Sequence, residues 1–74
     1  MPIFRVFARD NSVSLVIRAR CISCARQIAA ERSPADEFAL WSDPQQSGVE
    51  WISNPEAQGY LTEGRAGIIK RISA

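Results

Sequence analysis

Two cysteines three positions apart are the residues of this sequence best suited to chemistry. The stretch Cys21-Ile22-Ser23-Cys24 lies where the apolar pattern changes from that of a strand to that of a helix. A thiol pair at this spacing can bind a metal ion or exchange as a dithiol, and a helix N-terminus favours the thiolate. Zinc needs four ligands, however, and the chain has no further Cys and no His. We therefore favour free thiols that pack as small apolar residues, and we predict no metal site and no cofactor.

A second candidate site combines cations with an aromatic ring. Arg5, Phe7 and Arg9 are alternate residues of one predicted strand, and Arg18 and Arg20 are alternate residues of the next. Alternate side chains share one face of a sheet, so we group them as the arginine face: Arg5, Phe7, Arg9, Arg18 and Arg20. Such a face suits an acidic protein partner, the phosphates and bases of a nucleic acid, or simple solvation. Because the face is predicted to be exposed, we expect that substituting Arg5 and Arg18 with Glu leaves the fold intact but weakens partner binding.

Catalytic groups are scarce in this chain. Histidine, the usual general base near neutral pH, is absent. Serine and cysteine nucleophiles would have no evident base beside them, and a domain this small leaves little room for a cleft. We therefore predict no catalytic residues and no enzyme activity.

Composition points to one folded domain, residues 1–74, with a thin core. Apolar residues make up 46% of the chain and charged residues 23%, which excludes a disordered tail. The net charge of +1 conceals an arginine-rich first half and an acidic second half, so the chain is neither a polycation nor an acidic DNA mimic. No apolar run has membrane-helix length, and Arg5 and Arg9 interrupt any signal peptide. We expect a location in the cytoplasm of a host cell and no membrane partner.

Hydrophobic periodicity predicts the hairpin that carries the arginine face. Alternating apolar residues in 2–9 and 13–19 flank the turn residues 10–12, whose short polar side chains favour a tight reversal. A register that places Val6 opposite Leu15 makes the two apolar faces coincide. A slip by one residue would turn one set to solvent, so the pattern selects this register.

The period then changes to that of an amphipathic helix over about residues 22–32, which ends before Pro34. Its predicted core stripe is Ile22, Ala25, Ile28 and Ala29. Arg26 is predicted on the solvent side. The N-cap stays open between Cys21, which is a poor cap, and Ser23.

The second half predicts further strands over 36–42, 49–52 and 67–72, and a short helical turn that starts at Asn54-Pro55. Trp41 and Trp51 fall on neighbouring predicted strands. We expect both to be buried, and an exposed one would be an interface anchor. The predicted fold class is α+β: an antiparallel or mixed sheet of four to five strands with one main helix packed on one face, in the order ββαβββ.

The passage SVSLVIRARCISCARQIAAE, followed by paired strands, resembles small phage-encoded type I anti-CRISPR proteins. The resemblance covers the pattern of residues 1–52, and no motif in it assigns a role to a residue. It implies one helix on a bent sheet, a cytoplasmic location and an inhibitor that blocks the DNA binding or nuclease recruitment of a CRISPR surveillance complex.

These observations predict a non-enzymatic inhibitor or adaptor that binds a larger host protein or ribonucleoprotein complex. In a chain of this charge, the arginine face would contact acidic protein surface or guide RNA. The alternative is a small nucleic-acid-binding domain that uses the same face.

Overall fold

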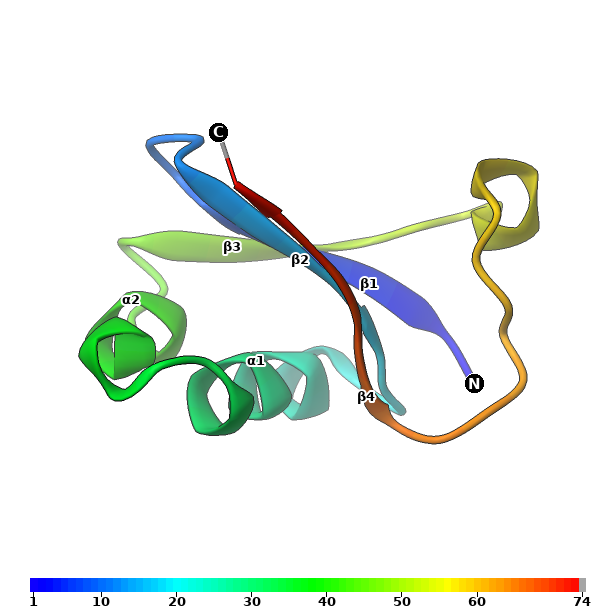
Figure 1. The fold of residues 1–74 in the computed structure, drawn as a ribbon, viewed down its shortest axis with the longest axis horizontal. Helices are drawn as coiled ribbons and strands as arrows, with labels where there is room; N and C mark the ends of the chain where they lie inside the picture. The colour runs from blue at the N-terminus through cyan, green and yellow to red at the C-terminus, as the bar shows by residue number, and fades with distance from the viewer. Residues whose placement is uncertain (74) are drawn as a thin grey trace.

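A four-stranded antiparallel sheet and two helices on one side of it make up the fold (Figure 1). The computed structural model describes residues 1–73. The strands are β1 (Ile3–Ala8), β2 (Val13–Arg18), β3 (Ser47–Trp51) and β4 (Gly67–Ser73), in the spatial order β3-β1-β2-β4. The helices are α1 (Ile22–Arg32) and α2 (Phe38–Ser42), with 3-10 turns η1 (Ala35–Glu37) and η2 (Pro55–Gln58). The predicted α+β class with one main helix is confirmed. Among residues 1–73, no helix has both the length and the apolar character needed to cross a bilayer.

The hairpin of β1 and β2 has the predicted register, with Val6 opposite Leu15. Its turn is held by the Asp10 carboxylate, which accepts the Ser12 backbone N–H at 2.9 Å. Asn11 takes a φ of 64°, a left-handed conformation that Asn tolerates better than most residues. Local turn chemistry and the coincidence of two apolar faces therefore specify the same pairing.

The core lies between the hairpin and α1. It is formed by the inner face of the sheet, the alanine side of the helix and one large aromatic ring: Phe4, Val6, Ala8, Val13, Leu15, Ile17, Ala19, Ala25, Ala29, Ala30 and Trp41. Ile22 was predicted in the core stripe but is 59% exposed, since the buried part of α1 begins at Ala25. Small side chains on α1 leave room for Trp41, which fills the core from α2.

The prediction of a strand over residues 36–42 is wrong, because η1 and α2 occupy this segment. Its apolar residues are consecutive, and over so short a run a strand period cannot be told from a buried helical segment. The helix buries Trp41 fully and leaves Phe38 57% exposed. The Trp41 indole N–H donates to the Glu37 carboxylate at 3.0 Å, an i to i+4 contact that helical geometry allows. The predicted order ββαβββ therefore loses one strand.

The strand β4 is fastened to the helical layer by an ion pair. Arg71 lies opposite Leu15, so it is on the helix side of the sheet. Its guanidinium donates to the two carboxylate oxygens of Glu37 at 2.9 and 2.6 Å. This hydrogen bonding lowers the pKa of Glu37 below its ordinary value. A two-point contact of this kind fixes the orientation of both side chains.

We predict that Leu15→Ala lowers the free energy of unfolding by about 2–5 kcal/mol, because Leu15 is fully buried and the change leaves a cavity. Leu61→Ala is the matched control, since the same atoms are removed where the side chain is 69% exposed. Its cost should stay below about 0.5 kcal/mol. Urea unfolding followed by circular dichroism measures both, and equal losses would contradict this description of the core.

The Glu37–Arg71 pair predicts a dependence of stability on pH. A carboxyl group whose pKa falls on folding stabilises the protein at neutral pH. This stabilisation begins to decrease as the pH falls below about 4.3, the ordinary glutamate pKa, and is lost once the pH is below the lowered pKa of Glu37 in the folded protein. We expect Glu37→Gln to be less stable than the wild type at pH 7, with a gap that narrows toward pH 3. Urea unfolding at both pH values tests this, with exposed Glu63→Gln as control. A gap of constant size would exclude the pair as its cause.

Candidate functional site

The face of the sheet that points away from α1 carries the first part of the arginine face. We call it the outer face. Its cross-strand rows follow from the register. One row reads Glu50, Arg5, Val16 and Lys70, from β3 to β4. The next row reads Gly48, Phe7, Ser14 and Ile72. The row that contains Phe7 and Ile72 thus runs beside the row that contains the charged Glu50, Arg5 and Lys70.

Phe7 is held between two guanidinium groups on this face. The Cζ atoms of Arg5 and Arg9 lie 4.7 and 6.0 Å from the centroid of its ring. Arg5 forms a salt bridge of 3.1 Å with Glu50 on the neighbouring strand. The Nε and Nη2 atoms of Arg9 donate to the Pro44 carbonyl at 3.1 and 3.0 Å. The side chains that flank the ring are therefore fixed before any partner arrives.

The Phe7 ring also depends on the absence of a side chain at Gly48. A Cβ atom built at Gly48 would lie 2.6 Å from the Cζ atom of Phe7. No real Cβ tolerates that distance, so the ring covers the glycine backbone directly. Glycine at this position of a strand marks such a close approach.

Arg18 does not take part in the group around Phe7, because its guanidinium is hydrogen-bonded to another segment of the chain. Its Nε and Nη2 atoms donate to the Leu61 carbonyl at 3.0 and 2.7 Å, and its Nη1 atom donates to the Arg65 carbonyl at 3.1 Å. The chain passes so close that a Cβ at Gly64, where φ is 128°, would lie 2.7 Å from Nη1. Arg18 thus fastens residues 61–65 to β2. We therefore expect substitution of Arg18 to lower the stability of the protein, unlike substitution of an exposed residue without such contacts.

Arg20 lies apart from both groups. It follows the end of β2, is exposed, and directly precedes Cys21. Alternation along a strand predicted that it would share a face with Arg18, but the strand ends at Arg18 and alternation ends with it. The structure therefore unites Arg5, Phe7 and Arg9 and leaves Arg18 and Arg20 outside the group.

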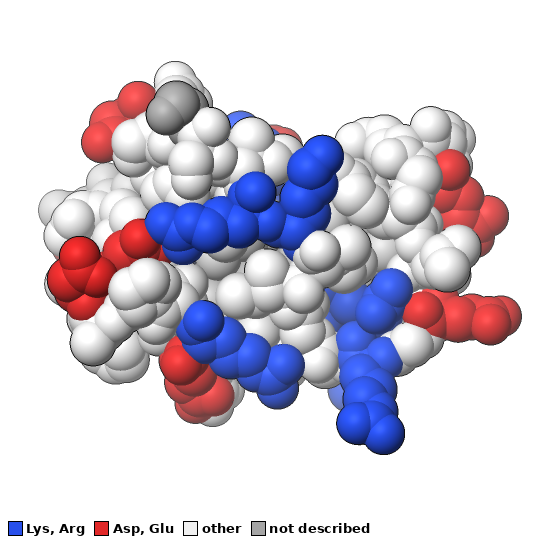
Figure 2. Space-filling model, in the orientation of Figure 1, with Lys and Arg blue, Asp and Glu red and all other residues white. Residues whose placement is uncertain are grey.

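Lys70 was missed by the sequence reasoning, although it belongs to the same outer face. It lies opposite Val16, with Arg5 as the next residue in that row on the other side. The strand that contains Lys70 was predicted, but the sequence did not predict that this strand pairs with β2. We call Arg5, Phe7, Arg9 and Lys70 the outer cluster. Figure 2, in the orientation of Figure 1, views the molecule from the side of β4 and shows several Lys and Arg side chains on that side.

Trp51 is the second exposed feature that could meet a partner. It is 64% exposed, whereas Trp41 is fully buried, so the prediction of burial holds for only one of the two. Trp51 ends β3, where the chain leaves the sheet toward η2 (Figure 1). It lies opposite Phe4 and so on the helix side of the sheet, beside a shallow groove. The groove is also lined by Met1, Pro2, Ile52, Pro55 and Thr62.

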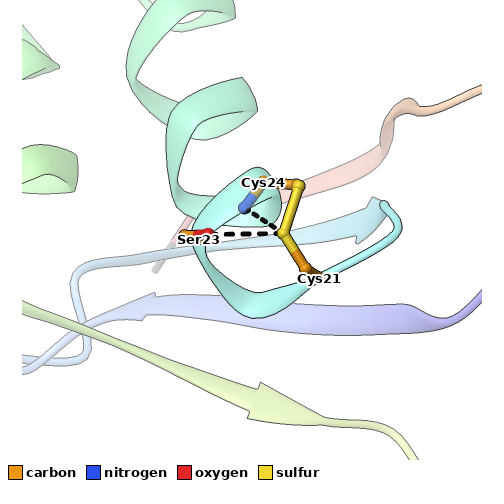
Figure 3. Close-up of a disulfide and its surroundings, with 3 residues drawn as sticks. All are labelled: Cys21, Ser23 and Cys24. Atoms are coloured by element: carbon orange, nitrogen blue, oxygen red, sulfur yellow. Dashed lines mark hydrogen bonds between the residues drawn. A yellow bond between two sulfur atoms is a disulfide. The ribbon is translucent and has the colours of Figure 1, made fainter.

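The two cysteines form a disulfide across the first turn of α1, so the prediction of free thiols is wrong (Figure 3). Their Cα atoms lie 5.0 Å apart, within the reach of a disulfide. Cys21 is the N-cap, and its sulfur accepts the Cys24 backbone N–H at 3.0 Å. In the part of the chain that the structure describes, no three or more His, Cys, Asp or Glu side chains gather to hold a metal ion.

Comparisons with known proteins leave the chain without an assigned family. No family model matches it, and neither a curated protein nor a solved structure matches it. The resemblance to anti-CRISPR proteins therefore gains no support from relatives. What the chain does has to be inferred from the surfaces described above.

We predict that Arg18→Ala destabilises the protein by about 1–3 kcal/mol, because two backbone carbonyls lose a charged donor. Amide hydrogen exchange should rise in residues 61–65, which Arg18 holds. Exposed Arg20→Ala is the matched control and should change neither quantity. If exchange in 61–65 is the same in both variants, Arg18 does not fasten the segment.

Proposed function

We propose that this chain is a non-catalytic binding protein that inhibits or bridges a larger host protein or ribonucleoprotein complex in the host cytoplasm. The observation that carries this proposal is the outer cluster. Two of its cations, Arg5 and Arg9, flank one aromatic ring on an open sheet face, and Lys70 and the acid Glu50 lie in the same cross-strand row as Arg5. Acidic protein surface is the complementary chemistry.

The composition of the two rows favours a protein partner. Arginine and aromatic residues are enriched among the residues that dominate interface energies. Phe7 and the 41% exposed Ile72 supply apolar contact in one row, and Arg5 and Lys70 supply charge in the adjacent one. Protein interfaces combine an apolar centre with a polar rim in this way.

Preorganisation adds to the case. Glu50 and the Pro44 carbonyl hold the two guanidinium groups that flank Phe7. Side chains that are ordered before binding lose little conformational entropy on association, so more of the contact energy appears as affinity. Lys70, the remaining cation of the cluster, is exposed.

A CRISPR surveillance complex is the specific partner that the resemblance in residues 1–52 proposes. Such a complex offers both acidic protein surface and guide RNA to a cationic face. Inhibition would follow if docking covered the surface needed for target DNA or nuclease recruitment. Bare nucleic acid is the competing ligand, because an aromatic ring between cations can also receive a base beside phosphates.

We expect Lys70→Glu to weaken partner binding by at least about tenfold, because the reversal replaces attraction by repulsion at the outer cluster. Arg65→Glu makes the same charge change at an exposed residue of the 61–65 segment and should bind as the wild type does. The measurement is a pull-down from lysate of the native host, followed by affinity titration of the captured complex.

The result for the two variants decides the proposal. A complex retained by wild type and Arg65→Glu but lost by Lys70→Glu supports docking through the outer cluster. Equal retention by both variants would exclude this surface. A salt series with bare RNA and DNA separates the competing ligand, since tight binding with a steep loss at high salt would indicate phosphate neutralisation.

A further inference from the structure

We infer that the Cys21–Cys24 disulfide is a redox site that exchanges with thiols, and that Cys21 is the sulfur that leaves as a thiolate when an incoming thiolate attacks Cys24. This inference goes beyond the proposed binding function and does not depend on it, because the outer cluster and the disulfide belong to different parts of the chain. It rests on the contacts that distinguish the two sulfur atoms (Figure 3).

The two cysteines of the bridge are not equivalent. The Cys21 sulfur accepts the backbone N–H of Cys24 at 3.0 Å and lies 3.3 Å from the Ser23 hydroxyl. Cys24 instead packs against the hydrophobic core. Both are half-buried, so a small thiol can reach the bridge from solvent. The sulfur with two polar neighbours is thus the one prepared to carry negative charge.

The surroundings of Cys21 favour a thiolate further. It caps α1, a helix of 11 residues, and the first turn of that helix contains no acidic side chain. The free backbone N–H groups of a helix start attract an anion. Each of these features stabilises a thiolate at Cys21 relative to one at Cys24.

The exchange is balanced with a dithiol as the reductant. One thiolate of the dithiol attacks the Cys24 sulfur, the Cys21–Cys24 bond breaks, and its electron pair leaves with the Cys21 sulfur, which stays a thiolate held by the Cys24 N–H and the Ser23 hydroxyl. The second thiolate of the dithiol then attacks the sulfur of its own molecule in the mixed disulfide with Cys24. Cys24 leaves and takes up a proton. The protein gains two electrons and the dithiol becomes a disulfide.

The fold does not rely on the bridge for the position of α1. The disulfide closes a loop of sequence separation 3, so it restricts the unfolded chain little. The helix is held instead by the buried Ala25 and Ala29 and by three hydrogen bonds from Arg26. The bridge can therefore open and close while the rest of the molecule keeps its structure.

Two single-thiol variants test the assignment. Cys24→Ser leaves Cys21 with the backbone N–H of residue 24 and the Ser23 hydroxyl, and Cys21→Ser leaves Cys24 alone. We expect iodoacetamide to alkylate Cys24→Ser about three- to tenfold faster than Cys21→Ser at pH 7. A larger thiolate fraction raises the rate, and the lower nucleophilicity of a stabilised thiolate offsets part of the gain. Adding Ser23→Ala to Cys24→Ser should slow the reaction.

A measurement on the wild type completes the test. Dithiothreitol should reduce the protein without loss of its far-ultraviolet circular dichroism, and oxidised glutathione should restore the disulfide, as counted by free thiols. Oxidised glutathione should also form a mixed disulfide with Cys24→Ser. Equal alkylation rates in the two variants would overturn the role of Cys21. Unfolding on reduction would overturn the redox site and make the bridge structural.

Discussion

The guanidinium group of Arg26 is the contact on which the arrangement of the elements depends. From the middle of α1 it donates to the Trp41 carbonyl at 2.9 Å, to the Ser47 hydroxyl at 2.7 Å and to the Ser47 carbonyl at 3.2 Å. One half-buried cation thereby joins α1, α2 and β3. A half-buried charge costs free energy unless its N–H groups are hydrogen-bonded. Here they donate to Trp41 near the end of α2 and to Ser47 at the start of β3.

The Arg26 contact also determines which residues lie side by side on the outer face of the sheet. Ser47 is fully buried at the start of β3, so Arg26 fixes where that edge strand begins beside β1. With that start fixed, Gly48 lies under Phe7 and Glu50 lies beside Arg5. The Glu37–Arg71 pair acts similarly on the other edge, where it ties β4 to the segment that precedes α2. Interactions on the helix side thus set the rows of the outer face.

Arginine has two roles in this small protein: some guanidinium groups bind backbone carbonyls, and some flank the Phe7 ring of the outer cluster. Arg18, Arg26 and Arg32 donate to backbone carbonyls of segments distant in the sequence, and Arg9 does the same with the loop before β3. A planar group with five donors can satisfy several carbonyls at once, which lysine cannot. In a chain with a thin core, these contacts hold loops that apolar burial does not reach. Arg9 combines both roles, because its fixed guanidinium also flanks Phe7.

The sequence by itself determined the features that arise from short-range pattern. The register of the β1–β2 hairpin, the span of α1 and the final strand were predictable because periodicity and turn chemistry act between near neighbours. The same pattern placed Arg5, Phe7 and Arg9 on one face. Tertiary structure alone decided that residues 38–42 are helical, that Lys70 joins the outer cluster and that Arg18 and Arg26 are bound within the fold. The physical reason is that these arginines bind mainly backbone carbonyls, which every residue carries, so no residue type marks the partner in the sequence.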